Sequence, residues 1–278
     1  MIILFTDLDG SLLDQSTYSA DPAREALCYI KELGLPLVFC SSKTRAEVEY
    51  WRTRLSNRHP FIVENGAALF VPHGYFPEPF HTPVNRNSYG VIEFSAPYAQ
   101  LVETLQLASQ ETGCRVRGFH DMSPEEISFR CGLPLQQARL AKMREYDEPF
   151  EILDPFRDEL LEAIEARGKH CTRGGRFYHI VGVNNKAHGV CLLTSHFERT
   201  YSEIITVGLG DGMNDVDFLR FVDLPVIVRS SAARELKSQL SRARVTDLAG
   251  PAGWNQAVLE ILDEHAPAAE AATMALVR

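Results

Sequence analysis

Two short stretches of the chain carry four aspartates among glycines, and each stretch follows an apolar run. Asp7 and Asp9 lie in TDLDG after IILF, and Asp211 and Asp215 lie in GDGMND after IITVGL. Carboxylates packed this closely repel one another in a site of low dielectric constant. Mg²⁺ relieves that repulsion, because it prefers oxygen ligands and keeps positions for water and substrate phosphate. The four aspartates are therefore predicted to hold Mg²⁺, with Asp215 binding directly, through water, or only capping a helix.

A cation and hydroxyl groups for the same site follow other apolar runs. Ser41, Ser42 and Lys43 come after LPLVFC, and Lys186 opens a helix much later in the chain. The transition state of phosphoryl transfer is stabilised mostly by positioning and by charge. Lys186 and Ser41 supply a charge and a hydrogen-bond donor of that kind.

Two of the aspartates have the chemistry that a phosphatase needs. Asp7 can attack phosphorus to give an aspartyl phosphate. Asp9, two residues on, can protonate the leaving oxygen and later deprotonate the attacking water. Together with Ser41 and Lys186, these two residues are the predicted catalytic groups.

Several neighbouring polar residues have a second, purely structural interpretation. One of Ser41 and Ser42 is expected to cap the next helix, while the other contacts phosphate. Lys43 is either an anion ligand or a surface charge, and a cation at a helix start opposes the helix dipole. Asn65 and Gly66, in the stretch ENGA, are either substrate contacts or a turn.

The elements that must position these groups alternate between buried strands and helices. Apolar runs predict strands over 2–5, 35–40, 204–209 and 224–228, and a further strand with its loop over 61–67. Helices are predicted between them, over 22–33, from 41 onward, and over 187–196 and 214–221. This alternation predicts an α/β fold with a doubly wound, mainly parallel sheet. Ligands of such sheets bind beyond the carboxyl ends of the strands, where the polar residues above would meet.

The middle of the chain has a different pattern and is predicted to be an insert. Residues 71–89 are rich in Pro, Gly, Asn and His and suit a linker. The predicted core domain comprises residues 1–82 and 184–278, and the predicted α+β cap comprises residues 83–183. Within the cap, strands are expected at 91–96, 150–153 and 176–183, with helices at 97–112, 134–146 and 155–167. The alanine-rich tail, residues 266–278, is weakly patterned and is expected to fray.

Composition limits the classes of molecule that the protein is expected to bind. The net charge of −9 argues against broad nucleic-acid binding, which requires a basic face, but permits a local cationic pocket for a small anion. No stretch approaches the roughly 18 apolar residues of a membrane span. The six cysteines are scattered without a CxxC pair, which suits a reducing cytosol. A cytoplasmic, soluble protein with a small-molecule substrate is expected, and the oligomeric state is left open.

The motifs resemble those of the haloacid dehalogenase-like (HAD) phosphatases. The resemblance rests on DLDGS at 7–11, a serine after the second strand, a lysine after a cap, and GDGMND at 210–215. It implies Asp7 as nucleophile, Asp9 as acid/base, and Ser41 and Lys186 as phosphate ligands. It also implies that Asp7, the Asp9 carbonyl and Asp211 hold Mg²⁺. The insert resembles the larger C2B-type cap of the Cof-type branch.

Further motifs narrow the resemblance to the mannosyl-3-phosphoglycerate phosphatases. These are CSSKTRAEV (40–48), ENGA (64–67), REYDEPF (144–150), GGRFYH (174–179) and GLGDGMND (208–215). Members of that family remove phosphate from mannosyl-3-phosphoglycerate with Mg²⁺ and yield the compatible solute mannosylglycerate. The GGRFYH motif implies that Arg176 and His179 contact the glycerate carboxylate or the sugar.

Three functions are therefore weighed. The first is a Mg²⁺-dependent phosphatase of a mannosyl- or glucosyl-3-phosphoglycerate, a phosphorylated glycoside, working through an aspartyl phosphate. The second keeps the core but changes the substrate, as in another sugar-phosphate phosphatase or a phosphomannomutase-like enzyme. The third is a non-catalytic phosphometabolite sensor, which the presence of both aspartates of DLDGS and of the lysine disfavours.

Overall fold

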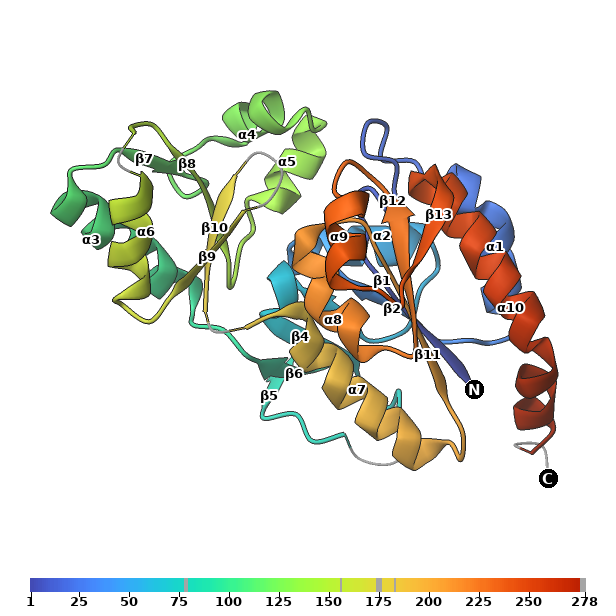
Figure 1. Ribbon diagram of the computed structural model, residues 1–278. Helices are drawn as coiled ribbons and strands as arrows, with labels where there is room; N and C mark the ends of the chain where they lie inside the picture. Colours follow the sequence, from blue (N-terminus) through green and yellow to red (C-terminus); the bar gives the residue numbers. More distant parts are fainter. Residues whose placement is uncertain (78–79, 156, 174–176, 183, 276–278) are drawn as a thin grey trace.

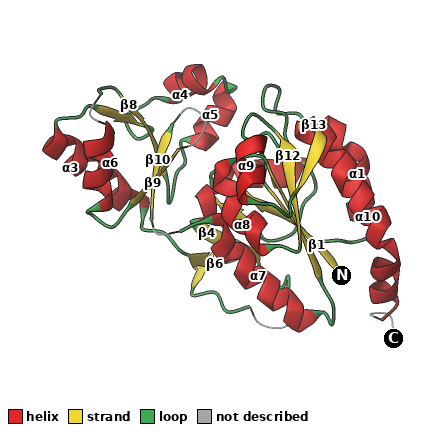
Figure 2. Cartoon of the chain, in the orientation of Figure 1, coloured by secondary structure: helices red, strands yellow, loops and turns green. Residues whose placement is uncertain are grey.

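The computed structural model describes residues 1–77, 80–155, 157–173, 177–182 and 184–275, with side chains described through residue 265. A larger unit holds both ends of the described chain, and a smaller unit built from the middle of the sequence lies beside it (Figure 1). Helices pack on sheets in both units (Figure 2).

The larger unit is built on a mixed sheet. In the described part of the chain this sheet has nine strands, in the order β13-β12-β11-β1-β2-β3-β4-β6-β5. Neighbours from β13 to β3 are parallel, and β4, β6 and β5 extend the edge in antiparallel fashion. The strands are β1 (Ile2–Thr6), β2 (Leu37–Cys40), β3 (Phe61–Val63), β4 (Ala68–Pro72), β5 (Val84–Arg86), β6 (Tyr89–Glu93), β11 (Ile205–Gly210), β12 (Leu224–Arg229) and β13 (Arg244–Ala249). The predicted doubly wound, mainly parallel α/β fold is confirmed.

Helices cover both faces of this sheet. They are α1 (Arg24–Glu32), α2 (Arg45–Arg54), α7 (Lys186–Thr200), α8 (Val216–Phe221), α9 (Ala233–Gln239) and α10 (Gly250–Ala275). Alternate residues of β1 point to opposite faces of the sheet. Ile2 and Leu4 belong to the apolar cluster that α1, α2 and α10 cover. Ile3 and Phe5 belong to the apolar cluster on the other face, which α7, α8 and α9 cover. A strand buried on both faces needs an unbroken apolar run, which is why IILF is apolar throughout.

The smaller unit, the cap, is an α+β unit as predicted. In the described residues its antiparallel sheet has the order β7-β8-β10-β9. Helices α3 and α6 share one apolar cluster with this sheet, and α4 and α5 form another. The elements are α3 (Tyr98–Thr112), β7 (Val116–Gly118), α4 (Pro124–Cys131), α5 (Leu135–Ala141), β8 (Glu148–Ile152), α6 (Arg157–Glu165), β9 (His170–Arg173) and β10 (Tyr178–Val181).

The insert begins later than the predicted boundary at residue 83. Strands β5 and β6 fall within 83–183, yet both pair in the core sheet, so the chain leaves that sheet after Glu93. Prolines and glycines near residue 80 mark an irregular stretch, but the antiparallel pairing that follows is a tertiary contact. The prediction of a helix over 134–146 is also too long, because α5 ends at Ala141 and an irregular segment follows.

The end of the chain contains elements that were not predicted. After β12 come α9, β13 and α10, and α10 continues through the alanine-rich stretch to Ala275 rather than fraying from residue 266. Alanine has the highest helix propensity, so a weak hydrophobic pattern there is compatible with a helix. Among the described residues, we find no helix with the length and apolar character that crossing a membrane would require.

Candidate active site

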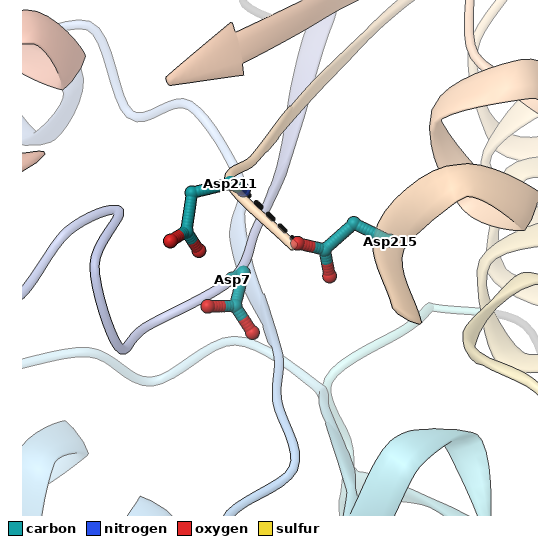
Figure 3. Close-up of side chains that lie close together, drawn as sticks. All are labelled: Asp7, Asp211 and Asp215. Atoms are coloured by element: carbon teal, nitrogen blue, oxygen red, sulfur yellow. Dashed lines mark hydrogen bonds between the residues drawn. The ribbon is translucent and has the colours of Figure 1, made fainter. Parts of the chain in front are cut away.

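The two aspartate motifs meet because their strands are neighbours. β1 pairs in parallel with β11, and the backbone N–H of Asp7 donates to the Leu209 carbonyl at 2.8 Å. In the described part of the chain, Asp7, Asp211 and Asp215 each offer a carboxylate oxygen within 4.8 Å of the others. Figure 3 shows these three side chains converging. The acidic cluster thus forms at the carboxyl edge of the sheet.

Glycines make room for this cluster. A Cβ on Gly10, whose φ is +78°, would lie 2.3 Å from an oxygen of Asp211, and one on Gly210 would lie 2.6 Å from an oxygen of Asp215. Gly208 instead permits close packing, because its Cβ would lie 2.8 Å from the side chain of Val222, just after α8, and close to Leu219 and Phe218 of that helix.

Lys186 is buried in the acidic cluster. Its Nζ donates to Asp7 Oδ1 at 2.6 Å and to Asp215 Oδ1 at 2.5 Å. The lysine begins α7, which Asn185 caps by accepting from a backbone N–H. Gly66 permits this approach, because at a φ of +86° its Cβ would lie 2.1 Å from the Asn185 carbonyl oxygen. Gly66 thus packs against the segment that leads into Lys186.

The cluster holds surplus negative charge. Burial raises the pKa of Asp7 to about 7, with Lys186 opposing the rise and Asp215 adding to it. Burial, followed by repulsion from Asp7 and Asp215, raises the pKa of Asp211 to about 8. Burial lowers the pKa of Lys186, but the pull of Asp215 and Asp7 outweighs it and the net shift is upward. One ammonium therefore leaves part of the carboxylate charge uncompensated, and the all-oxygen donor set fits a hard divalent cation.

Asp215 organises the loop around the cluster. Its Oδ2 accepts from the backbone N–H groups of Asp211 and Gly212, both at 3.0 Å, while Oδ1 receives Lys186. The carboxylate is fully buried and precedes α8 without a side-chain cap bond to that helix. Asp215 is thus the N-cap residue of α8 by position, but its side chain bonds Lys186 and the preceding loop rather than that helix.

Lys43 is buried rather than a surface charge. Its Nζ lies 2.9 Å from Asp9 Oδ1 and 3.5 Å from Glu47 Oε1, and it sits 5.2 Å from the centroid of the Tyr18 ring. Burial lowers the lysine pKa, but the two carboxylates outweigh burial and the net shift is upward. A permanent cation therefore contacts the predicted acid/base, Asp9.

Neither Ser41 nor Ser42, the two serines that follow β2, caps α2. Thr44 is the N-cap, and its Oγ1 accepts from the Glu47 backbone N–H at 3.1 Å. The expectation that Ser41 or Ser42 caps this helix is therefore wrong. Ser41 is fully buried and its Oγ accepts from the backbone N–H of Lys43, whereas Ser42 lines the cavity described below.

A hydrogen-bonded chain links the acidic loop to the cap. Asn214 Nδ2 donates to Asn65 Oδ1 at 3.0 Å, and Asn65 Nδ2 donates to Asp147 Oδ2 at 2.8 Å. Asp147 also contacts His179 Nδ1, at 2.9 and 3.0 Å. The sequence prediction missed Asp147 and Asn214, although both lie in quoted motifs, REYDEPF and GDGMND. The predicted substrate residue Arg176 lies outside the described residues.

The cap segment 142–147 docks on the core. Both carboxylate oxygens of Glu64 accept from backbone N–H groups of Glu145 and Tyr146. Arg45 on α2 pairs with Glu145 at 2.8 Å, and Arg144 Nη1 donates to the Ser42 carbonyl at 2.9 Å. Cap and core are thus joined beside the segments that follow β2 and β3.

A cavity of about 1010 Å³ lies over the acidic cluster. The core contributes Asp7, Asp9, Ser42, Asn65 and Asp211, together with the segment 229–232. The cap contributes Thr172, Arg173 and His179. A space of this size, walled by both units, suits a small polar ligand placed between them.

The fold and this sheet-edge cluster define a haloacid dehalogenase-like hydrolase. The family model of that description matches residues 4–75. A HAD subclass IIB sugar phosphatase has the same fold, with a TM-score of 0.64 at 20% identity over 94% of this chain and 99% of that one. Sucrose-phosphatase from Synechocystis shares it with a TM-score of 0.59 at 14% identity over 95% and 97%.

Relatives identified by sequence indicate a narrower family within these hydrolases. A glucosyl-3-phosphoglycerate/mannosyl-3-phosphoglycerate phosphatase of Methanococcoides burtonii is 39% identical over 95% of this chain and 98% of its own. A mannosyl-3-phosphoglycerate phosphatase of Pyrococcus furiosus is 35% identical over 81% and 90%. The chain belongs to the mannosyl-3-phosphoglycerate phosphatase family of HAD-like hydrolases, as its motifs predict, and is a phosphoric monoester hydrolase.

Proposed function

We propose that this phosphatase uses Mg²⁺ to release inorganic phosphate from a glycosyl-3-phosphoglycerate, with mannose or glucose as the sugar. The observation that carries the proposal is the buried Lys186 between Asp7 and Asp215 beneath a cavity that the cap completes. The relatives supply the substrate class, because those from Methanococcoides burtonii and Persephonella marina are named for both glycosyl-3-phosphoglycerates.

Asp7, Asp211 and the Asp9 carbonyl would hold the Mg²⁺, with Asp215 beside them or bound through water. The ion would neutralise charge on the phosphoryl oxygens and offset the repulsion within the acidic cluster. The net charge of −9 also fits a small-molecule partner rather than nucleic acid or an anionic membrane surface. We place the reaction in the cytoplasm, in keeping with the scattered cysteines.

The proposed reaction has two displacements at phosphorus. A carboxylate oxygen of Asp7 attacks, the ester P–O bond breaks, and Asp9 gives its proton to the departing glycerate oxygen. Water then attacks the aspartyl phosphate, Asp9 accepts the water's proton, and the P–O bond to Asp7 breaks to release phosphate. Lys186 and Ser41 bind the phosphoryl oxygens through both displacements.

The cap would select the rest of the substrate. Its wall over the cavity presents Thr172, Arg173 and His179, which can bind sugar hydroxyls or the glycerate carboxylate. Ser42, Lys43 and Asn65 would extend this recognition on the core side. Closure over the substrate would exclude bulk water from the reacting phosphoryl group.

The proposal is tested by measuring phosphate release from mannosyl- and glucosyl-3-phosphoglycerate, with Mg²⁺ and with EDTA, for wild type and Asp7→Asn. We expect Mg²⁺-dependent turnover by the wild type and a loss of at least about a thousandfold in the variant, which lacks the nucleophile. Equal rates for the two proteins would reject the proposed mechanism. Turnover only with a sugar bisphosphate activator would indicate a phosphomutase, and binding without turnover would indicate a sensor.

A further inference from the structure

Asp147 is a buried cap carboxylate to which the motifs and the proposed chemistry assign no role. Its side chain has no exposed surface, and it lies between a core residue, Asn65, and a cap residue, His179. Arg144 contributes a third, longer contact at 3.9 Å. Burying a charge is unfavourable unless several partners compensate, so these partners keep the carboxylate ionised. Burial alone raises the pKa of Asp147, but His179, Arg144 and Asn65 together bring it below its usual value.

This carboxylate fixes the orientation of the His179 ring. Nδ1 faces Asp147 at 2.9 Å, so Nδ1 carries the proton and donates it. His179 lines the cavity, and among the residues that the structure describes its Nε2 has no hydrogen-bond partner. Asp147 therefore leaves Nε2 available to a ligand in the cavity.

The same carboxylate also fixes the histidine relative to the phosphate site. Asn65 reaches Asp147 with its amide nitrogen and receives Asn214 on its amide oxygen. Asn214 adjoins Asp215, which contacts Lys186. Asn65 has a left-handed backbone, with φ of 59° and ψ of 36°, a conformation that asparagine tolerates better than most residues. A continuous series of contacts thus runs from the acidic cluster to His179, the cap imidazole that lines the cavity.

A glycosyl-3-phosphoglycerate has two anionic groups, a phosphate and a carboxylate, on opposite ends of one three-carbon backbone. The phosphate belongs at Asp7 and Lys186, so the carboxylate needs a second cationic or donor group held at a set distance. We propose that Asp147 is a positioning residue that holds His179 as the receptor for the substrate carboxylate. This inference rests on the proposed function and adds to it the residue that sets this distance.

The chain supplies a matched control in the next residue. Glu148 is equally buried and likewise contacts an imidazole, His120 Nδ1, at 2.7 Å, as well as the Tyr98 hydroxyl at 2.5 Å. Neither His120 nor Tyr98 is among the residues that line the cavity. Glu148→Gln therefore neutralises a similar buried carboxylate–imidazole pair in the same unit without touching the proposed receptor.

The experiment compares two substrates that differ only at the carboxylate. They are glucosyl-3-phosphoglycerate and 2-O-glucosylglycerol 3-phosphate, in which a hydroxymethyl group replaces it. For Asp147→Asn we expect kcat/KM for the first substrate to fall by about tenfold or more, mainly through KM, with little change for the second. Glu148→Gln should leave the preference between the substrates unchanged, even if it lowers the Tm. His179→Gln should reproduce the loss of preference, and adding Asp147→Asn to it should cause no further loss.

The outcomes separate this inference from the proposed function. A wild type that releases phosphate from neither mannosyl- nor glucosyl-3-phosphoglycerate would overturn both. If the wild type prefers the carboxylated substrate and Asp147→Asn keeps that preference, only the inference is overturned. Equal losses on both substrates, or the same change of preference in Glu148→Gln, would show that Asp147 acts only through the stability of the cap.

Discussion

Without a bound cation, the acidic cluster should destabilise the fold near neutral pH, and Asp211→Asn should relieve that burden. The pKa of Asp211 is about 8 in the folded protein, against 3.8 as the reference for the unfolded chain. The folded state thus keeps a proton that the unfolded state releases, and stability falls as pH rises from about 4 to about 8. Below this window the penalty vanishes, and above it the penalty is constant.

The size of the effect follows from this difference. At pH 7.5 linkage gives a penalty of up to ~5 kcal/mol, since each pH unit above 3.8 contributes ~1.4 kcal/mol. Asparagine removes the titration but brings an amide into a site built for carboxylates. We therefore expect about half of the penalty to be recovered, ~2–3 kcal/mol, or a rise in Tm of roughly 5–10 °C.

The assay is thermal unfolding in EDTA at pH 5 and pH 7.5, followed by the same scans in millimolar Mg²⁺. Asp211→Asn should be more stable than wild type in EDTA, with a larger difference at pH 7.5. Mg²⁺ should raise the Tm of the wild type and have much less effect on the variant, because it binds only the folded site. Asp263→Asn, at an exposed position of α10, is the control for a change in net charge. A variant less stable than wild type in EDTA at pH 7.5 would refute the reasoning.

Two further predictions concern the same cluster. Lys186→Met leaves Asp7 and Asp215 without their shared cation, so denaturant unfolding in EDTA should show a loss of about 3–5 kcal/mol, and a loss that Mg²⁺ does not reduce would contradict this account. Gly10→Ala places a Cβ 2.3 Å from an oxygen of Asp211 at a φ of +78°; we expect stability to fall by more than 1 kcal/mol, with weaker Mg²⁺ binding by calorimetry, and unchanged Mg²⁺ affinity would count against the tight fit.

Some errors in the sequence prediction have a common physical origin. The boundary at residue 83 and the helix over 134–146 were placed from local composition and periodicity. Strand β6 is assigned to the core by its pairing with β4, and the segment after Ala141 is held by the Glu64 carboxylate. Both are contacts between residues distant in sequence, which a local pattern does not encode.

The buried charged residues also divide into those that local sequence identified and those whose role depends on tertiary contacts. The sequence identified Asp7, Asp211 and Lys186 because each follows an apolar strand or opens a helix. It left Lys43 between two interpretations, and burial against Asp9 and Glu47 favours the site over the surface. It assigned no role to Asp147, although REYDEPF was recognised as a motif, since the role of a single buried aspartate depends on the side chains around it.

By itself, the sequence determined the family, the parallel core, and which residue types stand at the ends of its strands. Apolar runs and glycine-bounded aspartates are local features, and burial on both faces of a strand leaves a record in consecutive residues. Only the tertiary structure decided that a lysine 179 positions from Asp7 would lie 2.6 Å from it, and that Asn65, Asp147 and His179 would join core to cap. Such contacts depend on strand order and on how the cap docks, and these arise from packing of the whole chain.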